Sequence, residues 1–480
     1  LAFIALDERI HAVYFWNMVG SGLGGFLLLG LASFLPPDSL VIPVVVLAFA
    51  GHLLTSIRRN GIQERLEIPA RMLAVSTALM VASVAALFLW GEIRVSEYKA
   101  ISYVRKYPEV TEVHHEFSPA GEIHIYASSY FHFAPGLSDN AALDLGELPE
   151  QPFWGMYIDG NGPIGIMGEI NDPQQAKYMD YLPMAAPYAI MNRPEVLLVN
   201  LGGGIGAQIT KYQGSNQVTI LEENPEIYRL MKNTPEVARF TGNLLDDPVI
   251  DARIGDARAH AVEHPGEYDL VEISLIDSVG LSDSGGYAVH ENYTYTSEAI
   301  EEYMTGLTEE GILSITVWNR LSPPRNVLKL LSTVVHSLEA QGVEEPESRL
   351  FMFDLFLSTA TILVKNSPFT EGEIYDLRRF CETRSFEPAY YPGIEKRDIR
   401  LEEILETFER HFRQNLPLSE NVQFSPNDFY HLAALELLTG DPKKLYDGYV
   451  FDVEPMRDSR PYYTGFLKLG QIGMYLDQIQ

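Results

Sequence analysis

Three long apolar runs open the chain. Ala12 to Leu35 carries no charged side chain over 24 residues, Leu40 to Ile57 none over 18, and Met72 to Trp90 none over 19. At 1.5 Å per residue, a helix of each length can cross a hydrocarbon core of about 30 Å. A cleaved signal peptide would explain one such run but not three. The pattern therefore predicts a bundle of at least three transmembrane helices, at about 12–35, 40–57 and 72–90, in a membrane region spanning residues 1–95.

Beyond residue 95 the hydrophobic pattern changes three times. Residues 96–190 hold short alternating strands and turns, such as "EIHIYA" at 122–127, which predicts a small β-rich domain. From 191 to 365, apolar runs alternate with helical stretches, the pattern of a doubly wound, mostly parallel sheet. Residues 366–480 are predicted to be mainly helical. The fold class expected is thus α/β, with the small β domain and the helix bundle preceding a Rossmann-like domain.

Charge and cysteine content narrow the classes of partner. The chain has 35 basic and 65 acidic residues and a net charge of -30. This balance argues against a nucleic-acid partner, because phosphate contacts need clustered Lys and Arg. It suits a cationic small molecule, although acidity can also serve solubility alone. The single cysteine, Cys381, excludes an internal disulfide and a multi-cysteine metal cluster.

The middle region carries a nucleoside-binding pattern. Its first strand, "VLLVN", runs into a glycine loop that fits G-x-G-x-x-G/A, and Glu222 ends the next strand 20 residues after Gly202. Glycines let the backbone approach a ligand, and an acid at that strand end can accept hydrogen bonds from ribose hydroxyls. Asp256 follows the third strand, where it can accept from an adenine amino group. The cofactor-binding residues expected are Gly202, Gly204, Gly206, Glu222 and Asp256. A tight turn with a solvated Glu is the alternative, and a nicotinamide-dependent oxidoreductase fits the glycines as well.

Residues 150–320 resemble the spermidine synthases, aminopropyltransferases that use decarboxylated S-adenosylmethionine. The matching segments, in family order, are "YIDG" (157–160), "KYMDYLP" (177–183), "LGGGIG", "VTILEENPEI", "DDPVIDARIGDAR" and "YDLVEISLIDSVG". The resemblance implies that Glu222 holds the ribose and Asp256 the adenine. It also implies that Asp159 and Tyr178 face the substrate groove.

Two positions depart from the family's pattern. Where the family has two aspartates three residues apart after the fourth strand, this chain has Ser274 and Asp277, and Ile205 replaces an aspartate in the glycine loop. A serine hydroxyl alone is too weak a base to deprotonate an alkylammonium near neutral pH. The whole chain resembles a narrower group, the membrane-anchored spermidine synthase-like proteins. That resemblance rests on "SLID" (274–277), "HENYTYTSEAI" (290–300), "GILSITVW" and "RDSRPYY" (457–463).

The loop after the fourth strand is rich in carboxylates and tyrosines. Asp277, Glu291 and Tyr293 are the catalytic candidates, with Asp277 or Glu291 as base, and Tyr295 joins the groove of Asp159 and Tyr178. Together they predict an anionic, aromatic-walled pocket for an amine or a sulfonium. Local pairing of Glu291 and tyrosines in the core are the alternative. Glu272, within the strand, is a possible replacement acid, although an acid on a buried strand more often needs a structural partner.

No metal site is expected. His260 and His264 lie four apart on a predicted helix but lack a third ligand, and His114-His115-Glu116 is interpreted as ordinary polar surface.

The sequence leaves two main functions open. The first is a membrane-bound transferase that moves an aminopropyl or related group from S-adenosylmethionine or its decarboxylated form to an amine or other small acceptor. The second is an inactive relative that acts as a scaffold or accessory subunit in a membrane complex, since the usual catalytic aspartate is absent at Ser274. The expected location is a bacterial inner membrane, with the soluble part cytoplasmic if it uses S-adenosylmethionine. The basic residues that flank the third apolar run are balanced and do not decide the side.

Overall fold

The computed structural model describes most of the chain. The described residues are 10–32, 34–35, 37–57, 70–90, 95–118, 121–131, 136–146, 148–150, 152–275, 291–319, 323–414 and 424–471, with 473 and 475. The chain divides into two compact units. Unit 1 comprises Leu1–Arg105, Glu112–Ile125 and Tyr157–Asn161, and unit 2 comprises Lys106–Thr111, Tyr126–Met156 and Gly162–Gln480.

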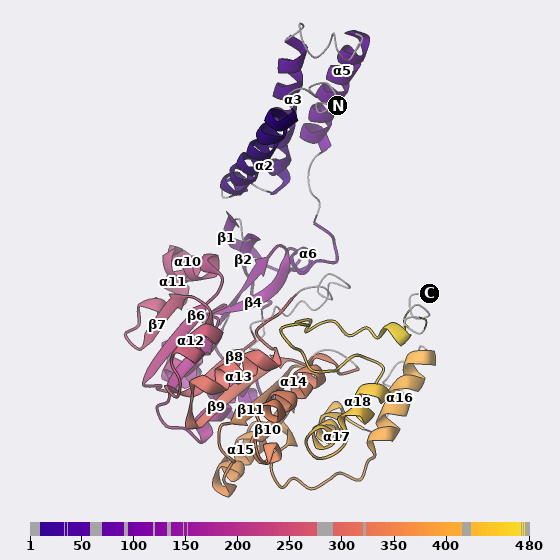
Figure 1. Cartoon of the computed structure of the whole chain (residues 1–480). Coiled ribbons are helices and arrows are strands. Elements are labelled where there is room, and N and C mark those ends of the chain that lie inside the picture. Colours follow the sequence, from indigo (N-terminus) through magenta and orange to yellow (C-terminus); the bar gives the residue numbers. More distant parts are fainter. Residues whose placement is uncertain are drawn as a thin grey trace. The chain divides into compact units, whose positions relative to one another are not determined.

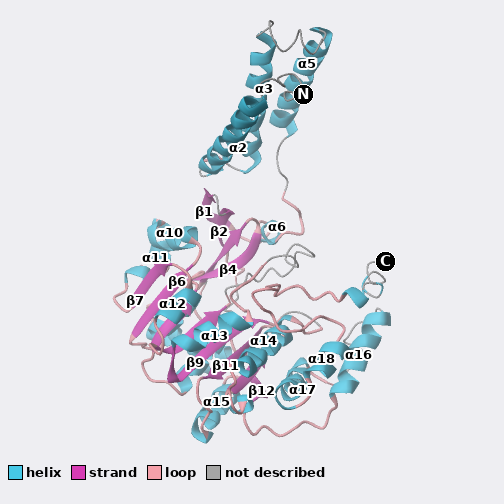
Figure 2. Ribbon diagram, viewed as in Figure 1, coloured by secondary structure: helices cyan, strands magenta, loops and turns pink. Residues whose placement is uncertain are grey.

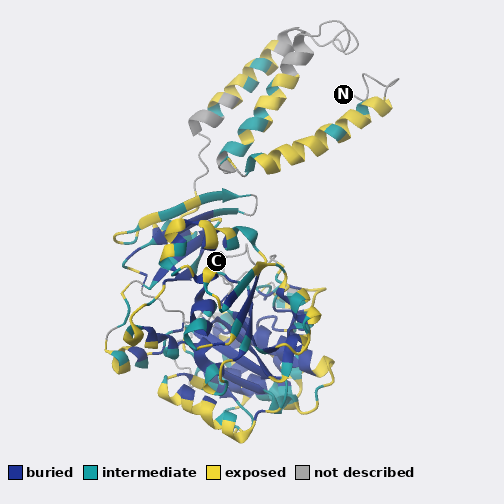
Figure 3. Cartoon of the chain, turned by 90° about the vertical axis from the view of Figure 1, so that its left-hand side faces the viewer, coloured by how far each residue is buried: buried dark blue, intermediate teal, exposed yellow. Residues whose placement is uncertain are grey.

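Unit 1 begins with three helices at the predicted apolar runs. They are α2 (Ile10–Ala32), α3 (Val41–Ile57) and α5 (Ala70–Trp90), with a short 3-10 turn, η2 (Pro37–Leu40), between the first two. Helices α3 and α5 lie side by side (Figure 1). None of the described side chains of α2 is buried (Figure 3). Phe26, for example, is 78% exposed. Helices thus occupy the three apolar runs of the sequence.

The prediction of three membrane spans is corrected to one candidate. Among the described residues, only α2 is long and apolar enough to cross a membrane. Within α3 and α5, the described segments Val41–Gly51 and Ala74–Ser83 are apolar as well. Because α2 lies near the first residue of the chain, an anchor and a signal sequence both fit it.

A small antiparallel sheet follows. It has the order β1-β2-β3-β4 and consists of β1 (Thr111–Ser118), β2 (Gly121–Ala127), β3 (Phe153–Ile158) and β4 (Asn161–Met167). The short helices α6 (Ala100–Val104) and α7 (Asn140–Leu145) lie before and within it in the sequence. Asp159 and Gly160 connect β3 to β4 with φ values of 50° and 77°. Positive φ at both positions is the signature of a two-residue hairpin turn, for which Asp-Gly is a preferred sequence.

Unit 2 is built on an eight-stranded sheet of order β12-β10-β11-β9-β8-β5-β6-β7 (Figure 2). The strands are β5 (Glu195–Val199), β6 (Gln217–Glu222), β7 (Ile250–Ile254), β8 (Tyr268–Ser274), β9 (Leu307–Trp318), β10 (Leu350–Leu355), β11 (Thr359–Lys365) and β12 (Glu387–Tyr390). The five from β5 to β9 match the predicted apolar runs and pair in parallel. The other three pair antiparallel, so the sheet is mixed rather than mostly parallel throughout.

Helices connect and flank these strands. They are α8 (Pro173–Ala176), α9 (Ile205–Tyr212), α10 (Pro225–Asn233), α11 (Pro235–Phe240), α12 (Ala257–Glu263), α13 (Ser297–Gly306), α14 (Asn326–Ala340), α15 (Glu371–Thr383), α16 (Leu401–Gln414), α17 (Pro426–Thr439) and α18 (Pro442–Gly448). Shorter 3-10 turns are η3 (Lys177–Tyr181), η4 (Pro183–Ala189), η5 (Leu244–Asp246), η7 (Pro346–Ser348) and η8 (Leu469–Gln471). One continuous apolar core joins β8, β9 and β11 to α13, α14 and α17 (Figure 3).

Candidate functional site

The order of the strands defines where a ligand would bind. From β5 the chain adds β6 and β7 on one side and then returns to place β8 and β9 on the other side of β5. In open α/β sheets ligands bind at such a reversal, at the carboxyl ends of the strands. Here that point lies between the ends of β5 and β8. The glycine loop follows β5, and Ser274 ends β8.

The glycine loop turns the chain from β5 into α9. Gly202 and Gly204 have φ values of 51° and 79°, a backbone conformation that favours glycine. Gly203 is required for a different reason. A Cβ atom there would lie 1.9 Å from the carbonyl oxygen of Gly165 in β4, and Gly203 in turn accepts a hydrogen bond from the backbone N–H of Met167 at 3.0 Å. The face of Gly203 is thus covered by a strand of the same unit.

Gly206 makes room for an acidic side chain. A Cβ atom at this position would lie 3.1 Å from Oε1 of Glu272, so the carboxylate packs against the first turn of α9. Glu272 is fully buried on β8, between β5 and β9. The amino end of a helix carries a partial positive charge and is a favourable neighbour for a carboxylate.

Glu272 and Ser274 form a hydrogen-bonded pair. The Ser274 hydroxyl donates to Oε1 of Glu272 at 2.6 Å, while no donor among the described residues reaches Oε2. Burial raises the pKa of Glu272 to about 7, and the Ser274 hydrogen bond offsets part of that rise. A carboxyl group with such a pKa exchanges a proton near neutral pH, which is the property of a general acid or base.

Glu222 is occupied by the glycine loop itself. Its Oε2 accepts from the backbone N–H groups of Leu201 and Gly202, at 2.8 and 3.1 Å, and its Oε1 accepts from that of Asn224 at 2.8 Å. Burial raises the pKa of Glu222, and these three N–H groups counteract the rise. The side chain predicted to hold a ribose therefore already fixes the shape of the loop.

Asp256 lies at the end of β7, next to the end of β6. It begins α12, where Oδ1 accepts from the backbone N–H groups of Arg258 and Ala259, and the residue is exposed. Glu223 is close enough that burial and the Asp256 charge together raise its pKa. Two carboxylates thus mark the edge of the sheet beside the glycine loop.

A small cavity lies between the glycine loop and the Glu272–Ser274 pair. Its volume is about 30 Å³, room for one or two water molecules and far below the roughly 300 Å³ of a small-molecule site. Residues 276–290, which follow Leu275 in the sequence, lie outside the described residues. The described walls of the cavity come from β4, the glycine loop, the ends of β8 and β9, and include Pro163, Gly165, Gly202, Gly203, Gly206, Glu272, Ser274, Leu275 and Trp318.

The predicted catalytic residues are not assembled at this cavity. Asp277 lies outside the described residues. Glu291 and Tyr293 are exposed and bind each other, with the Tyr293 hydroxyl donating to the Glu291 carboxylate at 3.0 Å. Tyr295 is buried and its ring lies 4.8 Å from that of Tyr463, in the core of unit 2. The structure therefore brings Glu291 and Tyr293 together on the surface and places Tyr295 elsewhere.

The two remaining groove residues are placed in different units. In unit 1, the Asp159 carboxylate accepts a hydrogen bond from the backbone N–H of Glu122 at 2.9 Å. In unit 2, Tyr178 is buried, and its hydroxyl has no hydrogen-bond partner among the described residues. Burial raises the pKa of Tyr178.

Gly165 and Trp318 are two of the wall residues that the sequence did not predict. A glycine inside a strand often marks a close approach of another backbone, so "GPIGIM" at 162–167 carried a signal for Gly165. Trp318 is the last residue of a long apolar strand, β9, and no feature of the sequence marked it as a site residue. Glu272 was recognised only as a possible replacement acid, and the structure places it in the cavity.

Comparison with known proteins gives distant structural similarity. No protein-family model matches the chain, and no curated protein does. A crystal structure of spermidine synthase in complex with the transition-state analogue AdoDATO shares 14% identity, with 55% of this chain and 76% of that chain covered and a TM-score of 0.36. Spermidine synthase from Thermotoga maritima shares 14% identity over 55% of this chain and 75% of that chain, with a TM-score of 0.35. A probable spermidine synthase from Corynebacterium glutamicum shares 16% identity over 61% of this chain and 100% of that chain, with a TM-score of 0.37. Similarity this distant carries no conclusion about activity.

Proposed function

We propose that this protein is a membrane-attached transferase of the spermidine synthase type, with a methyltransferase-like domain that binds an S-adenosylmethionine-type donor. The observation that carries the proposal is the Glu272–Ser274 pair. Ser274 stands where the family resemblance expects the catalytic aspartate, and its hydroxyl binds a buried carboxyl group with a pKa of about 7. The acid lost at position 274 is thus present two residues earlier on the same strand.

The reaction needs one proton acceptor. An alkylammonium acceptor first loses a proton to Glu272, and the free amine nitrogen then attacks the carbon next to the sulfonium of the donor. The new C–N bond forms as the C–S bond breaks, and the bonding electron pair stays on sulfur, which becomes a neutral thioether. Holding the two reactants in line supplies most of the rate enhancement. Glu272 supplies the base, with Ser274 orienting its carboxylate.

The donor would bind at the carboxyl ends of β5, β6 and β7. The first turn of α9 offers backbone N–H groups, and the exposed Asp256 is suited to accept from an adenine amino group. Glu222 shapes the loop through its three backbone hydrogen bonds and would orient ribose hydroxyls with the acceptor capacity that remains.

Donor binding is tested by calorimetric titration of the detergent-solubilised full chain. The titrants are S-adenosylmethionine, its decarboxylated form and methylthioadenosine. We expect saturable binding of at least one, weakened roughly 10-fold or more by Asp256→Ala, since a lost hydrogen bond to a charged group is worth about 1.5–3 kcal/mol. Asp251→Ala is the matched control, because Asp251 is on β7 and pairs with Arg253 instead. Absence of binding by the folded wild type rejects the transferase.

The base is tested by product formation with the donor that binds and a set of diamines. Glu272→Gln keeps the size of the side chain and removes its proton exchange, so we expect turnover to fall about 100-fold or more with donor binding retained. Turnover of the wild type should rise with pH through about 7, as Glu272 ionises. If Asp277→Asn abolishes turnover and Glu272→Gln does not, the base is Asp277.

A second function, a membrane scaffold, is favoured by a specific observation. The loop that should meet the donor is already engaged, with Gly203 against Gly165 and Glu222 bound to the loop backbone. A scaffold would need this loop only as a structural turn. In that case Asp256→Ala and Glu272→Gln should leave native membrane complexes unchanged in size, and no titrant should bind.

A further inference from the structure

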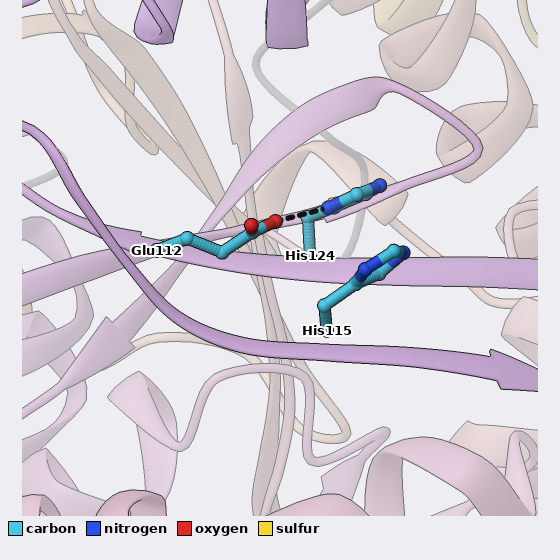
Figure 4. Close-up of side chains that lie close together, drawn as sticks. All are labelled: Glu112, His115 and His124. Atoms are coloured by element: carbon cyan, nitrogen blue, oxygen red, sulfur yellow. Dashed lines mark hydrogen bonds and ion pairs between the residues drawn. The ribbon is translucent and has the colours of Figure 1, made fainter.

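Two strands of unit 1 bring together imidazole and carboxylate side chains outside the site described above. Glu112 and His115 come from β1, and Glu122 and His124 from β2; we refer to these four as the hairpin cluster. Oε1 of Glu112 lies 2.6 Å from Nδ1 of His124 (Figure 4). Oε1 of Glu122 lies 3.1 Å from Nε2 of His124 and 2.8 Å from Nε2 of His115. The side chain of His124 is only 5% exposed.

The number of N–H donors in the hairpin cluster is smaller than its contacts require. A neutral imidazole has one N–H group and an ionised carboxylate has none. Glu122 faces the Nε2 atoms of both histidines, so it is satisfied when both rings carry hydrogen on Nε2. Nδ1 of His124 then presents a lone pair to the Glu112 carboxylate at 2.6 Å. A cation between these two atoms, either a second proton or a metal ion, is required to make that contact favourable.

The arrangement fits the way proteins hold transition metals. A metal-ligating histidine usually donates its other N–H to a carboxylate, which fixes the tautomer and the orientation of the ring. Glu122 does this for two rings at once. One ligand atom from each of Glu112, His115 and His124 lies within 4.8 Å of the others. Around a tetrahedral zinc with bonds of about 2.0–2.1 Å, ligand atoms are about 3.3 Å apart, so small movements would bring the three into place.

Exposure of the cluster would permit those movements. The rings of His115 and His124 are stacked, with centroids 4.0 Å apart and 14° between the planes. Convergence on one ion requires a rotation of one ring. The His115 side chain is 34% exposed, and besides His124 its ring contacts that of Phe117, with centroids 4.5 Å apart. The buried His124 would then be the fixed ligand, and His115 and Glu112 would close on the ion from the surface side.

We propose that the hairpin cluster is a binding site for a divalent transition metal, with zinc as the best match. Glu112, His115 and His124 supply the ligands, Glu122 positions both rings, and the ion ties β1 to β2. Two imidazoles and one carboxylate form the ligand set of three-ligand zinc sites that keep a fourth position for water. The expectation of ordinary polar surface at His114-His115-Glu116 is thereby revised for His115, because His124 and Glu122, its partners, come from the other strand.

The test is zinc binding by the full chain, purified in detergent without a polyhistidine tag. Competition with a fluorescent zinc chelator should give one zinc per chain. His115→Asn and Glu112→Gln, both at partly exposed positions, should weaken binding at least about 10-fold, and Glu122→Gln about 10- to 100-fold. Cobalt(II) should give the visible absorption of a tetrahedral site, and this band should be lost in His115→Asn.

Two controls separate the site from adventitious binding. His114→Asn alters the neighbouring histidine, which pairs with Glu116 rather than with the cluster. His260→Asn alters a second stacked histidine pair, His260 and His264, on and just beyond α12. Both variants should bind zinc as the wild type does. Loss of affinity in either control equal to that in His115→Asn, or no zinc on the wild type, would overturn the proposal.

Discussion

Glu272 is an ionisable side chain whose burial costs stability. A carboxyl group inside a sheet loses its hydration, and only the Ser274 hydroxyl compensates it among the described residues. An apolar residue or a glutamine at this position would avoid that cost. Unfavourable burial of an ionisable group beside a glycine loop is therefore an indication of a functional role rather than of a packing role.

The pH dependence of stability tests this reasoning. The pKa of Glu272 is raised to about 7 in the folded protein, above the roughly 4.5 of an exposed glutamate. Between these values the folded state holds a proton that the unfolded state has lost, so stability falls as pH rises from about 4.5 to 7. The difference corresponds to about 3 kcal/mol above pH 7, as an order of magnitude. We expect Glu272→Gln to be more stable than the wild type at pH 8 and similar at pH 4.5, as measured by thermal unfolding.

Ser337→Ala is the control variant for the comparison of Glu272→Gln with the wild type. Ser337 is a buried serine whose hydroxyl donates a hydrogen bond to the backbone oxygen of Ser297. Removing this hydroxyl should lower stability equally at both pH values, because the group does not ionise. If the difference in thermal stability between the wild type and Glu272→Gln is the same at every pH, Glu272 does not titrate near pH 7.

For individual residues, the sequence predicted the glycine loop but not the residues that the loop contacts. Gly202 and Gly204 could be predicted because a turn from strand to helix needs positive φ. The reason for Gly203 is the carbonyl of Gly165, 38 positions earlier, and no local pattern records such a contact. Glu222 was expected to bind a ribose, yet its oxygens hold the loop backbone, because a buried carboxylate takes the nearest N–H donors.

At the scale of elements, hydrophobic pattern located the strands but not all their directions. The five parallel strands coincide with apolar runs separated by helical stretches. The sequence did not reveal that β10 and β11 pair antiparallel. A strand that is buried on both faces has the same apolar composition in either direction. The apolar runs near the start of the chain likewise coincide with helices, and among the described residues only α2 is long and apolar enough to cross a membrane.

One ion pair connects two elements that are distant in sequence. Arg258, on α12, places two guanidinium nitrogens on the Asp458 carboxylate at 3.1 and 2.9 Å, and its Nε binds Glu302 of α13 at 2.5 Å. Thr296 also donates to Asp458, at 2.6 Å. The hydrogen bonds from Arg258 lower the pKa of Asp458 more than its burial raises it. This segment, near "RDSRPYY", is thus held against the helices beside the candidate site.

We expect Asp458→Asn to destabilise unit 2 by about 1 kcal/mol at neutral pH, because Asp458 is partly exposed and solvent screens the pair. The contribution exists above the ordinary pKa of an aspartate and is lost as pH falls through the lowered folded value. Urea unfolding followed by tryptophan fluorescence should show coupling between Arg258→Ala and Asp458→Ala in a double-mutant cycle. The same cycle on the exposed pair Arg253 and Asp251 should show less. Equal coupling in the two cycles would assign Asp458 no special role.

At the scale of the whole molecule, charge and hydrophobicity are separated along the chain. Residues 1–95 carry six basic and six acidic side chains, so the excess of acidic residues lies entirely in residues 96–480. Anionic lipid headgroups repel an acidic part of this kind, so attachment to a membrane would require apolar contacts. Helix α2 exposes large apolar side chains, among them Trp16, Leu23 and Phe26, which are exposed by 68%, 65% and 78%.

Membrane attachment through α2 is the last prediction. After alkaline carbonate extraction, the wild-type chain should remain with the membrane fraction, and mass spectrometry should find residues 10–32 in it, since a cleaved signal sequence would be missing. Replacing Leu23 and Phe26 by Asp places two charges near the centre of the helix, at about 2.5–3.5 kcal/mol each on the insertion scale, and should release the chain unless α3 and α5 hold it. A third variant that carries Asp in all three helices separates these cases: release only in this variant means that the shorter helices insert together with α2. Recovery of the wild type in the soluble fraction would exclude an anchor, and the exposed apolar face of α2 would then need a protein partner to cover it.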